Sequence, residues 1–264
     1  MLAHQGLGSR RAIESLITSG QVDVDGKKAH IGQRISRHSR VSVNGKKVYL
    51  TGSLGTDVLV LNKRVGTVST RKDEKDRTTI FKSLPKVPHG RWVSVGRLDI
   101  NTSGLMLLTN NGELANRMMH PSSGVDKEYA VRVNGLLGAE ELELLRGGVS
   151  LNGDFVRFTD IRFFDGSGRN KWYHVVVMDG KNHEVRNLFD YVGLTVSRLK
   201  RVRFGPVLLP ASLKEGQCSL LSDDDTLGLC GLFGLDYAVS PEKLKTRLNT
   251  SKKTMLIPYP SLEF

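Results

Sequence analysis

An uninterrupted apolar run, Leu105–Leu108, constrains this chain more than any other segment, because a polar loop of residues 96–104 directly precedes it. Consecutive apolar residues of this kind predict a strand buried on both faces. Such a strand fixes the end of the preceding loop at the edge of a core, and that loop carries one carboxylate, Asp99. An aspartate in a loop is most often a turn former or a cap. The run therefore leaves open whether Asp99 is structural or catalytic.

The segments around this run predict an α+β protein. Val58–Leu61 is a second apolar run and predicts another buried strand. Residues 196–204 alternate apolar and basic side chains, which predicts a strand with one inward face. Asn111 is expected to cap a helix. The predicted inner face of that helix consists of Leu114, Ala115, Met118 and Met119.

The charge of the chain favours a polyanionic partner. Its 39 lysines and arginines exceed its 27 acidic residues, leaving a formal net charge of +12 on 264 residues. Nucleic acid is the first candidate for such a field, and a merely basic soluble protein is the alternative. No segment approaches the ~18 apolar residues of a membrane span, and no secretory signal is recognisable. Cys218 and Cys230 form neither a disulfide framework nor a zinc motif, so we expect a cytoplasmic setting.

The first fifty residues have the character of a separate module. They hold nine lysines and arginines against three acids, half of the net charge of the chain. Ser9 is expected to cap a short helix, and residues 22–28 and 41–48 predict small strands joined by turns. Arg10 and Arg11 stand at the start of the predicted helix, where free N–H groups also attract phosphate. Residues 8–27, including Lys27, resemble the alpha-L RNA-binding domain first described in a ribosomal protein. The resemblance implies that Arg10, Arg11 and Lys27 bind RNA.

A longer string identifies the body of the chain. Residues 96–109 read Gly-Arg-Leu-Asp-Ile-Asn-Thr-Ser-Gly-Leu-Met-Leu-Leu-Thr, which resembles the active-site motif of the pseudouridine synthases. The match continues through residues 112–115, 119–121 and 127–129. This longer match resembles the branch that acts on single uridines in ribosomal RNA. Residues 180–186 and 196–199 most resemble the members of this branch that modify 23S rRNA.

The resemblance implies an isomerisation in which uracil is cut from its ribose, turned and rejoined through carbon. No redox step or group transfer occurs, so no cofactor is implied, and the chain has no glycine-rich dinucleotide or P-loop string. The target nucleotide must leave the RNA stack to be reached. Asp99 is then the essential carboxylate, which either attacks the sugar or the base or removes a ribose proton.

Three further positions acquire roles from the resemblance. Arg97 is expected to face the RNA and to fill the space left by the flipped base; otherwise it is a solvated loop arginine. Tyr129 is expected to lie against the target base, where its ring can stack; otherwise it is a core aromatic. Arg186 is expected to pair with the catalytic carboxylate and to lower its pKa. The string His183-Glu184 lacks the second histidine of a zinc site, so no metal is predicted.

The remaining predicted RNA contacts lie after residue 180. Lys181 stands in the same string as Arg186, and Arg198, Lys200 and Arg201 lie on the predicted strand 196–204, where a solvated edge strand is the alternative. The chain departs from the family at three positions, with His183 and Asn187 in place of arginine and Arg64 in place of proline. These departures concern the strength of RNA binding and the choice of target uridine.

We therefore predict an α+β protein with an alpha-L domain at residues 1–50, a linker at 51–56 and a pseudouridine synthase domain at 57–222. The synthase domain is expected to have a mixed, mainly antiparallel sheet flanked by helices, and residues 223–264 a partly flexible extension. The predicted partner is ribosomal RNA or a pre-ribosomal particle, without a membrane, bound by a monomer. Two alternatives are a non-catalytic RNA-binding or ribosome-assembly protein with the same fold, and an RNA methyltransferase, whose glycine-rich cofactor loop is not visible.

Overall fold

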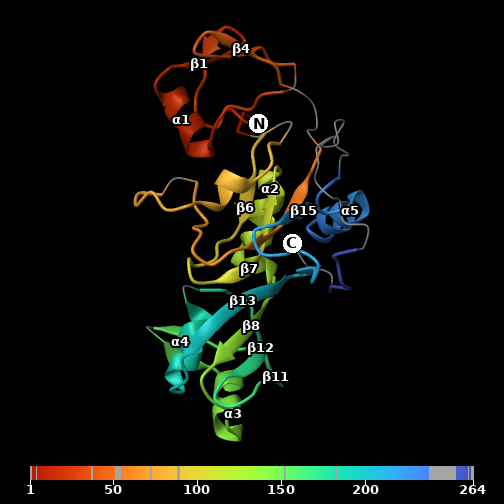
Figure 1. Cartoon of the computed structure of the whole chain (residues 1–264). Coiled ribbons are helices and arrows are strands. Elements are labelled where there is room, and N and C mark those ends of the chain that lie inside the picture. Colours follow the sequence, from red (N-terminus) through yellow and green to blue (C-terminus); the bar gives the residue numbers. More distant parts are fainter. Residues whose placement is uncertain are drawn as a thin grey trace.

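The computed structural model describes residues 2–3, 5–36, 38–50, 55–71, 73–87, 90–151, 153–181, 183–237, 254–260 and 262. A small N-terminal unit of residues 2–50 precedes a larger body that begins at residue 55 (Figure 1). The body contains the apolar strand and the Asp99 loop on which the functional argument depends. No helix among the described residues has the length and apolar character to cross a bilayer.

The N-terminal unit is a short helix packed on a small antiparallel sheet. Its elements are α1 (Arg10–Thr18), β1 (Val22–Val24), β2 (Lys27–Lys28), β3 (Val41–Val43) and β4 (Lys46–Val48). The strand order is β2-β1-β3-β4. Ser9 caps α1 as predicted, since its hydroxyl accepts a hydrogen bond of 3.0 Å from the N–H of Ala12. Leu2, Ile13 and three strand valines form its own apolar cluster.

A mixed, mainly antiparallel sheet forms the centre of the body, which confirms the predicted fold class. Its strands are β5 (Val58–Lys63), β6 (Val93–Val95), β7 (Ser103–Thr109), β8 (Lys127–Val133), β11 (Asp160–Asp165), β12 (Lys171–Val177), β13 (Val196–Phe204), β14 (Val207–Leu208) and β15 (Cys218–Leu220). The main order is β11-β12-β8-β13-β7-β5-β15, with β6 paired to β7 and β14 to β13. Among the described strands, only β13 and β7 pair in parallel.

Helices cover opposite faces of the two halves of this sheet. The remaining elements are η1 (Ile80–Ser83), α2 (Gly112–Met119), η2 (Pro121–Ser123), α3 (Ala139–Gly147), β9 (Val149–Leu151), β10 (Asp154–Val156), α4 (Glu184–Tyr191) and α5 (Asp223–Leu232). Residues of α3 and α4 share one core cluster with β8, β11 and β12, whereas residues of α2 and α5 share another with β5 and β7. Strands β5 and β7 supply alternate residues to both clusters, so they are buried on both faces as predicted.

Two details differ from the sequence prediction. Met119 is 43 % exposed, because it ends α2 and points away from the core that Leu114, Ala115 and Met118 enter. No placement of residues 227–235 was predicted, yet α5 packs into the core through Leu229 and Cys230. Buried Asp225 accepts a hydrogen bond of 3.0 Å from the N–H of Met255 and so ties α5 to the described end of the chain. Residues 238–253 of the predicted extension lie outside the described residues.

Candidate active site

The loop that carries Asp99 is held by its backbone. Leu98 is buried, and its N–H donates to the hydroxyl of Ser69 at 3.2 Å, while that hydroxyl donates to the carbonyl of Leu98 at 2.9 Å. The N–H of Thr102 donates to the carbonyl of Asp99 at 3.1 Å and closes a turn. The side chain of Asp99 is 38 % exposed. The loop is therefore fixed, and its one carboxylate remains accessible.

A buried lysine supports this loop from below. Lys63, at the end of β5, is 1 % exposed, and its ammonium donates to the carbonyls of Asp99, Thr102 and Arg64 at 3.0, 2.8 and 3.0 Å. Burial lowers the pKa of Lys63 to about 8, although the Asp99 carboxylate raises it. The ammonium is thus still charged near pH 7. Sequence analysis missed Lys63, and its only signal was a lysine at the end of an apolar strand.

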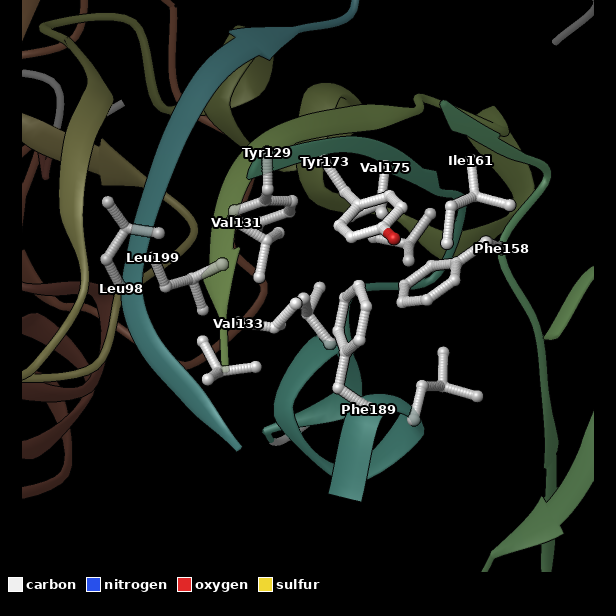
Figure 2. Packing of buried hydrophobic residues seen from close by; sticks show 14 of the residues in the cluster. Leu98, Tyr129, Val131, Val133, Phe158, Ile161, Tyr173, Val175, Phe189 and Leu199 are labelled. Atoms are coloured by element: carbon white, nitrogen blue, oxygen red, sulfur yellow. The ribbon is translucent and has the colours of Figure 1, made fainter. Parts of the chain in front are cut away.

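Asp99 lies in an open cleft of about 460 Å³. The cleft also contains Arg97, Tyr129 and Lys181, so it brings together four of the residues predicted from the sequence. Tyr129 comes from β8 and is 8 % exposed. In Figure 2 its ring lies near Leu98 and Leu199, on the side of the sheet that faces Phe189 of α4. The ring therefore forms part of the cleft floor and of the core at once.

A histidine occupies the position beside Asp99 where Arg186 was predicted. The Nε2 atom of His183 lies 3.6 Å from Oδ1 of Asp99. Arg186 instead donates to the carbonyls of Val196 and Asn101 at 3.0 and 3.1 Å, and within the described residues it forms no ion pair with Asp99. The predicted pairing is therefore wrong in this structure.

The start of α4 explains this exchange. His183 is the N-cap of α4 and has a left-handed backbone with φ of 55°. Arg186 lies inside the first turn of the helix, and its guanidinium is occupied by two carbonyls. One of these carbonyls belongs to Asn101, which lies in the same loop as Asp99. Arg186 therefore contacts the backbone of the loop, and His183 contacts the carboxylate of Asp99.

Arg201 was predicted to contact RNA, and the structure contradicts this prediction. Its side chain is 2 % exposed, donates to the carbonyl of Leu105 at 2.8 Å and lies 5.1 Å from the ring centroid of Phe204. It pairs with Tyr129 across β13 and β8, on the inward side of the sheet. A guanidinium buried in this way cannot reach a phosphate.

The other predicted RNA contacts lie at the surface. Lys181 is on the cleft rim, where its ammonium forms an ion pair of 2.7 Å with Asp154. Arg10, Arg11 and Lys27 are exposed on the N-terminal unit. Arg198 is exposed and Lys200 partly so, and neither borders the cleft. The structure therefore brings only Arg97 and Lys181 of these cations to Asp99.

Two acidic groups of the cleft were not found from the sequence. Glu184, 6 % exposed, accepts a hydrogen bond of 2.8 Å from the N–H of Lys181. Burial raises the pKa of Glu184, and this hydrogen bond, which acts to lower it, only partly offsets the effect. Asp73 forms an ion pair of 2.7 Å with Arg77 at the cleft rim, and hydrogen bonds from Arg77 lower its pKa to about 2. Both acids therefore make short hydrogen bonds or ion pairs within the protein, whereas the longer contact of 3.6 Å with His183 leaves the Asp99 carboxylate 38 % exposed in the cleft.

Comparison with known proteins gives this site a family. A family model described as RNA pseudouridylate synthase matches residues 57–191. A relative from Salmonella typhi is 42% identical over 260 residues, which cover 96% of this chain and 89% of the relative. The chain belongs to the RNA pseudouridylate synthase family.

Two relatives and one solved structure describe the likeness to this family further. The Salmonella typhi protein and a Pseudomonas aeruginosa protein are both named ribosomal large subunit pseudouridine synthase B. The Pseudomonas protein is 50% identical over 220 residues, which cover 82% of this chain but only 57% of the relative. A structure described as a pseudouridylate synthase superposes with a TM-score of 0.59 at 24% identity, covering 86% of this chain and 96% of that one, and so supports the fold.

The family match covers every residue that lines the cleft except Leu199, and it leaves out the surface cations of the N-terminal unit and of β13. Asp99, Tyr129 and Arg186 lie within residues 57–191, as do Lys63 and His183. The N-terminal unit and strand β13 lie outside that range. The pseudouridylate synthase likeness therefore bears most directly on the cleft.

Proposed function

We propose that this chain isomerises a uridine of large-subunit (23S) ribosomal RNA to pseudouridine. One observation carries the proposal. In a chain of this family, the carboxylate of Asp99 lies in an open cleft, on a loop whose backbone Lys63 fixes. The names and identity of the relatives support ribosomal RNA as the substrate. A cleft of about 460 Å³ lies in the range of sites that bury a ligand of nucleotide size.

The reaction balances without any added reactant. The bond between N1 of uracil and C1′ of ribose breaks, and a bond between C5 and C1′ forms after the base has turned. C5 loses a proton and N1 gains one, so no oxidant, reductant or group donor is required. Asp99 is the group placed to act on the sugar, on the base or on a ribose proton, and Tyr129 offers its ring to the flipped base.

A direct test is to incubate the purified protein with unmodified transcripts of 23S and of 16S rRNA and to map pseudouridine in each. We expect one modified uridine in the 23S transcript and none in the 16S transcript. Modification of 16S rRNA would overturn the substrate assignment. Binding of 23S rRNA without any pseudouridine would favour a non-catalytic assembly protein, an alternative that the departures at His183 and Asn187 keep in play.

The N-terminal unit is proposed to be an alpha-L RNA-binding domain. Arg10 and Arg11 are exposed at the first turn of α1, next to its free N–H groups. Replacing both with glutamate is expected to raise KM for 23S rRNA by about tenfold while kcat stays near its original value, because phosphate contacts add affinity without touching the reacting atoms. Kinetics at several salt concentrations measure this, since the salt dependence of binding should also weaken.

The same charge reversal elsewhere provides the control for this prediction. Lys82 and Lys214 are exposed and lie outside both the N-terminal unit and the cleft. Their double replacement by glutamate changes the net charge equally and should change KM much less. Equal effects of the two double variants would show that only the overall charge matters.

His183 is proposed to position the carboxylate of Asp99. Asparagine adopts the left-handed backbone readily, so His183→Asn removes the ring without disturbing the start of α4. Because both groups are partly exposed, the expected loss in kcat is about twofold to fivefold, with KM unchanged. His183→Arg places a permanent cation beside Asp99 and, if its Tm is unaltered, should retain activity. A larger loss in the arginine variant than in the asparagine variant would contradict this role.

The setting of the protein is also a proposal. We propose a monomer that acts in the cytoplasm on ribosomal RNA or on a pre-ribosomal particle. Residues of a single chain form the cleft, and Cys218 and Cys230 are free thiols, as a reducing compartment would keep them. Light scattering of the purified protein tests the monomer, and activity on deproteinised rRNA against assembly intermediates tests the substrate.

A further inference from the structure

Among the described residues, helices pack on only one side of one half of the central sheet. Strands β11, β12, β8 and β13 lie next to one another, and α3 and α4 pack on the side that carries Ile161, Tyr173 and Val131 (Figures 1 and 2). We call the other side of these four strands the open face. Within the described residues, no side chain of the open face belongs to an apolar cluster.

The first cross-strand row of the open face is basic and aromatic. Register places Asp165, Trp172, Arg132 and Arg198 side by side across the four strands. Arg198 is exposed, and Trp172 and Arg132 are partly exposed. The guanidinium of Arg132 lies 6.0 Å from the ring centroid of Trp172. Indole rings and guanidinium groups at a surface are both planar groups on which a nucleotide base can stack.

Arg132 is held in place before any ligand arrives. Its Nε donates to the hydroxyl of Ser197 at 2.9 Å, and that hydroxyl donates to the carbonyl of Arg132 at 3.0 Å. Ser197 falls at an irregularity in the pairing of β13 with β8. These bonds use the side of the guanidinium near the backbone and make no ion pair. The charge of Arg132 is therefore preorganised rather than neutralised.

The second cross-strand row of the open face is also rich in basic side chains. It consists of Arg162, His174, Ala130 and Lys200. Phe164, at a bulge of β11, is 69 % exposed and lies 4.9 Å from the ring of His174. Arg162 is paired with Asp160 at 2.8 Å, whereas Lys200 and Arg198 have no ion pair among the described residues. The first two rows thus present Arg132, Arg198 and Lys200 without an ion pair among the described residues, and the one acid of these rows, Asp165, lies at the β11 edge.

The third row of the open face consists of Asp160, Val176, Glu128 and Arg203, and its arginine is already paired with acids. Arg203 forms ion pairs of 2.7 and 2.9 Å with Asp126 and Glu128. Burial raises the pKa of Glu128, but hydrogen bonds from His174 and Arg203 outweigh it and lower the pKa overall. Because these groups are saturated, a ligand gains little from them. The available charge of the open face lies in its first two rows.

We propose that the open face binds ribosomal RNA outside the target loop, as a second contact surface of the same substrate. The proposal rests on the function proposed above. Three cations without acidic partners match phosphates, and Phe164 with Trp172 offers rings on which bases stack. A protein partner would need an apolar interface core, whereas the exposed rings here, Phe163 and Phe164, stand together at the β11 edge among charged side chains.

The alternation of β8 and β13 connects this surface with the cleft. Tyr129 of β8 and Leu199 of β13 line the cleft, while Lys200 and Arg132 of the same strands point to the open face. RNA on the open face therefore lies on the far side of the sheet from the reacting base. A long folded RNA can reach both sides, whereas a minimal stem-loop reaches only the cleft.

The test compares two RNAs with one double variant, Arg198→Gln with Lys200→Gln. The substrates are the full-length 23S rRNA transcript and a stem-loop just large enough to hold the uridine mapped in that transcript. We expect kcat/KM to fall by about tenfold on the long RNA, as the loss of two phosphate contacts implies, and to stay unchanged on the stem-loop. Lys82→Gln with Lys214→Gln is the matched control and should leave both values unchanged.

A second measurement locates the RNA directly. Trp92 is 4 % exposed, so Trp172 is the tryptophan that a ligand can reach. Long RNA should quench the tryptophan fluorescence of the protein, and Trp172→Phe should abolish that quenching.

Each other outcome has a definite meaning. Equal losses on both RNAs, or no loss and no quenching, would overturn the open-face proposal while activity on the stem-loop still upholds the proposed function. If the double variant lost activity only when the substrate was a ribosomal particle that contains proteins, the open face would bind a protein, and the open-face proposal would also be overturned. No activity of the unaltered chain on either RNA would overturn the proposed function itself.

Discussion

Asp99→Asn is expected to abolish pseudouridine formation, with a loss on the order of 10³-fold or more, while RNA binding survives. Asparagine has nearly the shape of aspartate but carries no charge, so it can neither attack the sugar or base nor accept a proton. The loop should keep its form, because Lys63, Ser69 and Thr102 hold it through backbone atoms and through contacts that do not involve the carboxylate. Substrate affinity, which depends mainly on cations, should change little.

Single-turnover pseudouridine formation and filter binding of 23S rRNA measure the two expectations separately. Asp190→Asn is the matched control, since Asp190 is exposed on α4 and does not border the cleft. It should have unaltered kinetics. If Asp99→Asn retained substantial activity, another group would have to perform the chemistry, and Glu184 and Asp73 are the other carboxylates that line the cleft.

The parts of the site that follow from local sequence were predicted well. The apolar run after the Asp99 loop is the buried strand β7, and Asp99 and Tyr129 line one cleft. Lys63 was missed because its role depends on three carbonyls, two of which lie 36 and 39 positions away in the chain. A lysine at the end of a strand normally reaches solvent, and only the tertiary fold turns this one inward.

The choice between His183 and Arg186 was beyond the sequence for a different reason. Both lie in one short string, and charge alone favours the arginine as the partner of a carboxylate. The fold decides otherwise, since α4 begins at Glu184 and His183 takes a left-handed conformation, in which histidine occurs more often than most other residues with a side chain. The residue at which a helix starts cannot be fixed from sequence more closely than about one turn, and here one turn changes the partner of Asp99.

The prediction for Arg201 was wrong because it followed the charge of the residue and not the pattern of the strand. Leu199 faces inward, and strict alternation from it places Arg201 inward as well, where it lies opposite Tyr129 in the pairing of β13 with β8. An inward arginine is unexpected because a buried charge needs partners. That partner is the carbonyl of Leu105 in β7, which the sequence of β13 does not reveal.

Gly104→Ala is expected to destabilise the protein by about 3 kcal/mol or more, because no side chain fits where β7 meets β13. Gly104 has φ of +102°, a backbone conformation that residues with a side chain rarely adopt. A Cβ there would also lie 2.2 Å from the carbonyl oxygen and 2.8 Å from the nitrogen of Arg201. These are backbone atoms of a paired strand, so relief requires the parallel contact between β7 and β13 to open.

Thermal unfolding followed by circular dichroism measures this effect, and a decrease in Tm of roughly 10 °C is expected for a chain of this size. Gly147→Ala is the matched control: Gly147 ends α3, and nothing lies within 4 Å of the Cβ it would gain. That variant should be as stable as the unaltered chain or slightly more so. An unchanged Tm for Gly104→Ala would show that β13 can move away from β7 at little cost. Since β7 follows the Asp99 loop and β13 carries Leu199 of the cleft, such freedom would also mean that the sheet does not hold the cleft rigid.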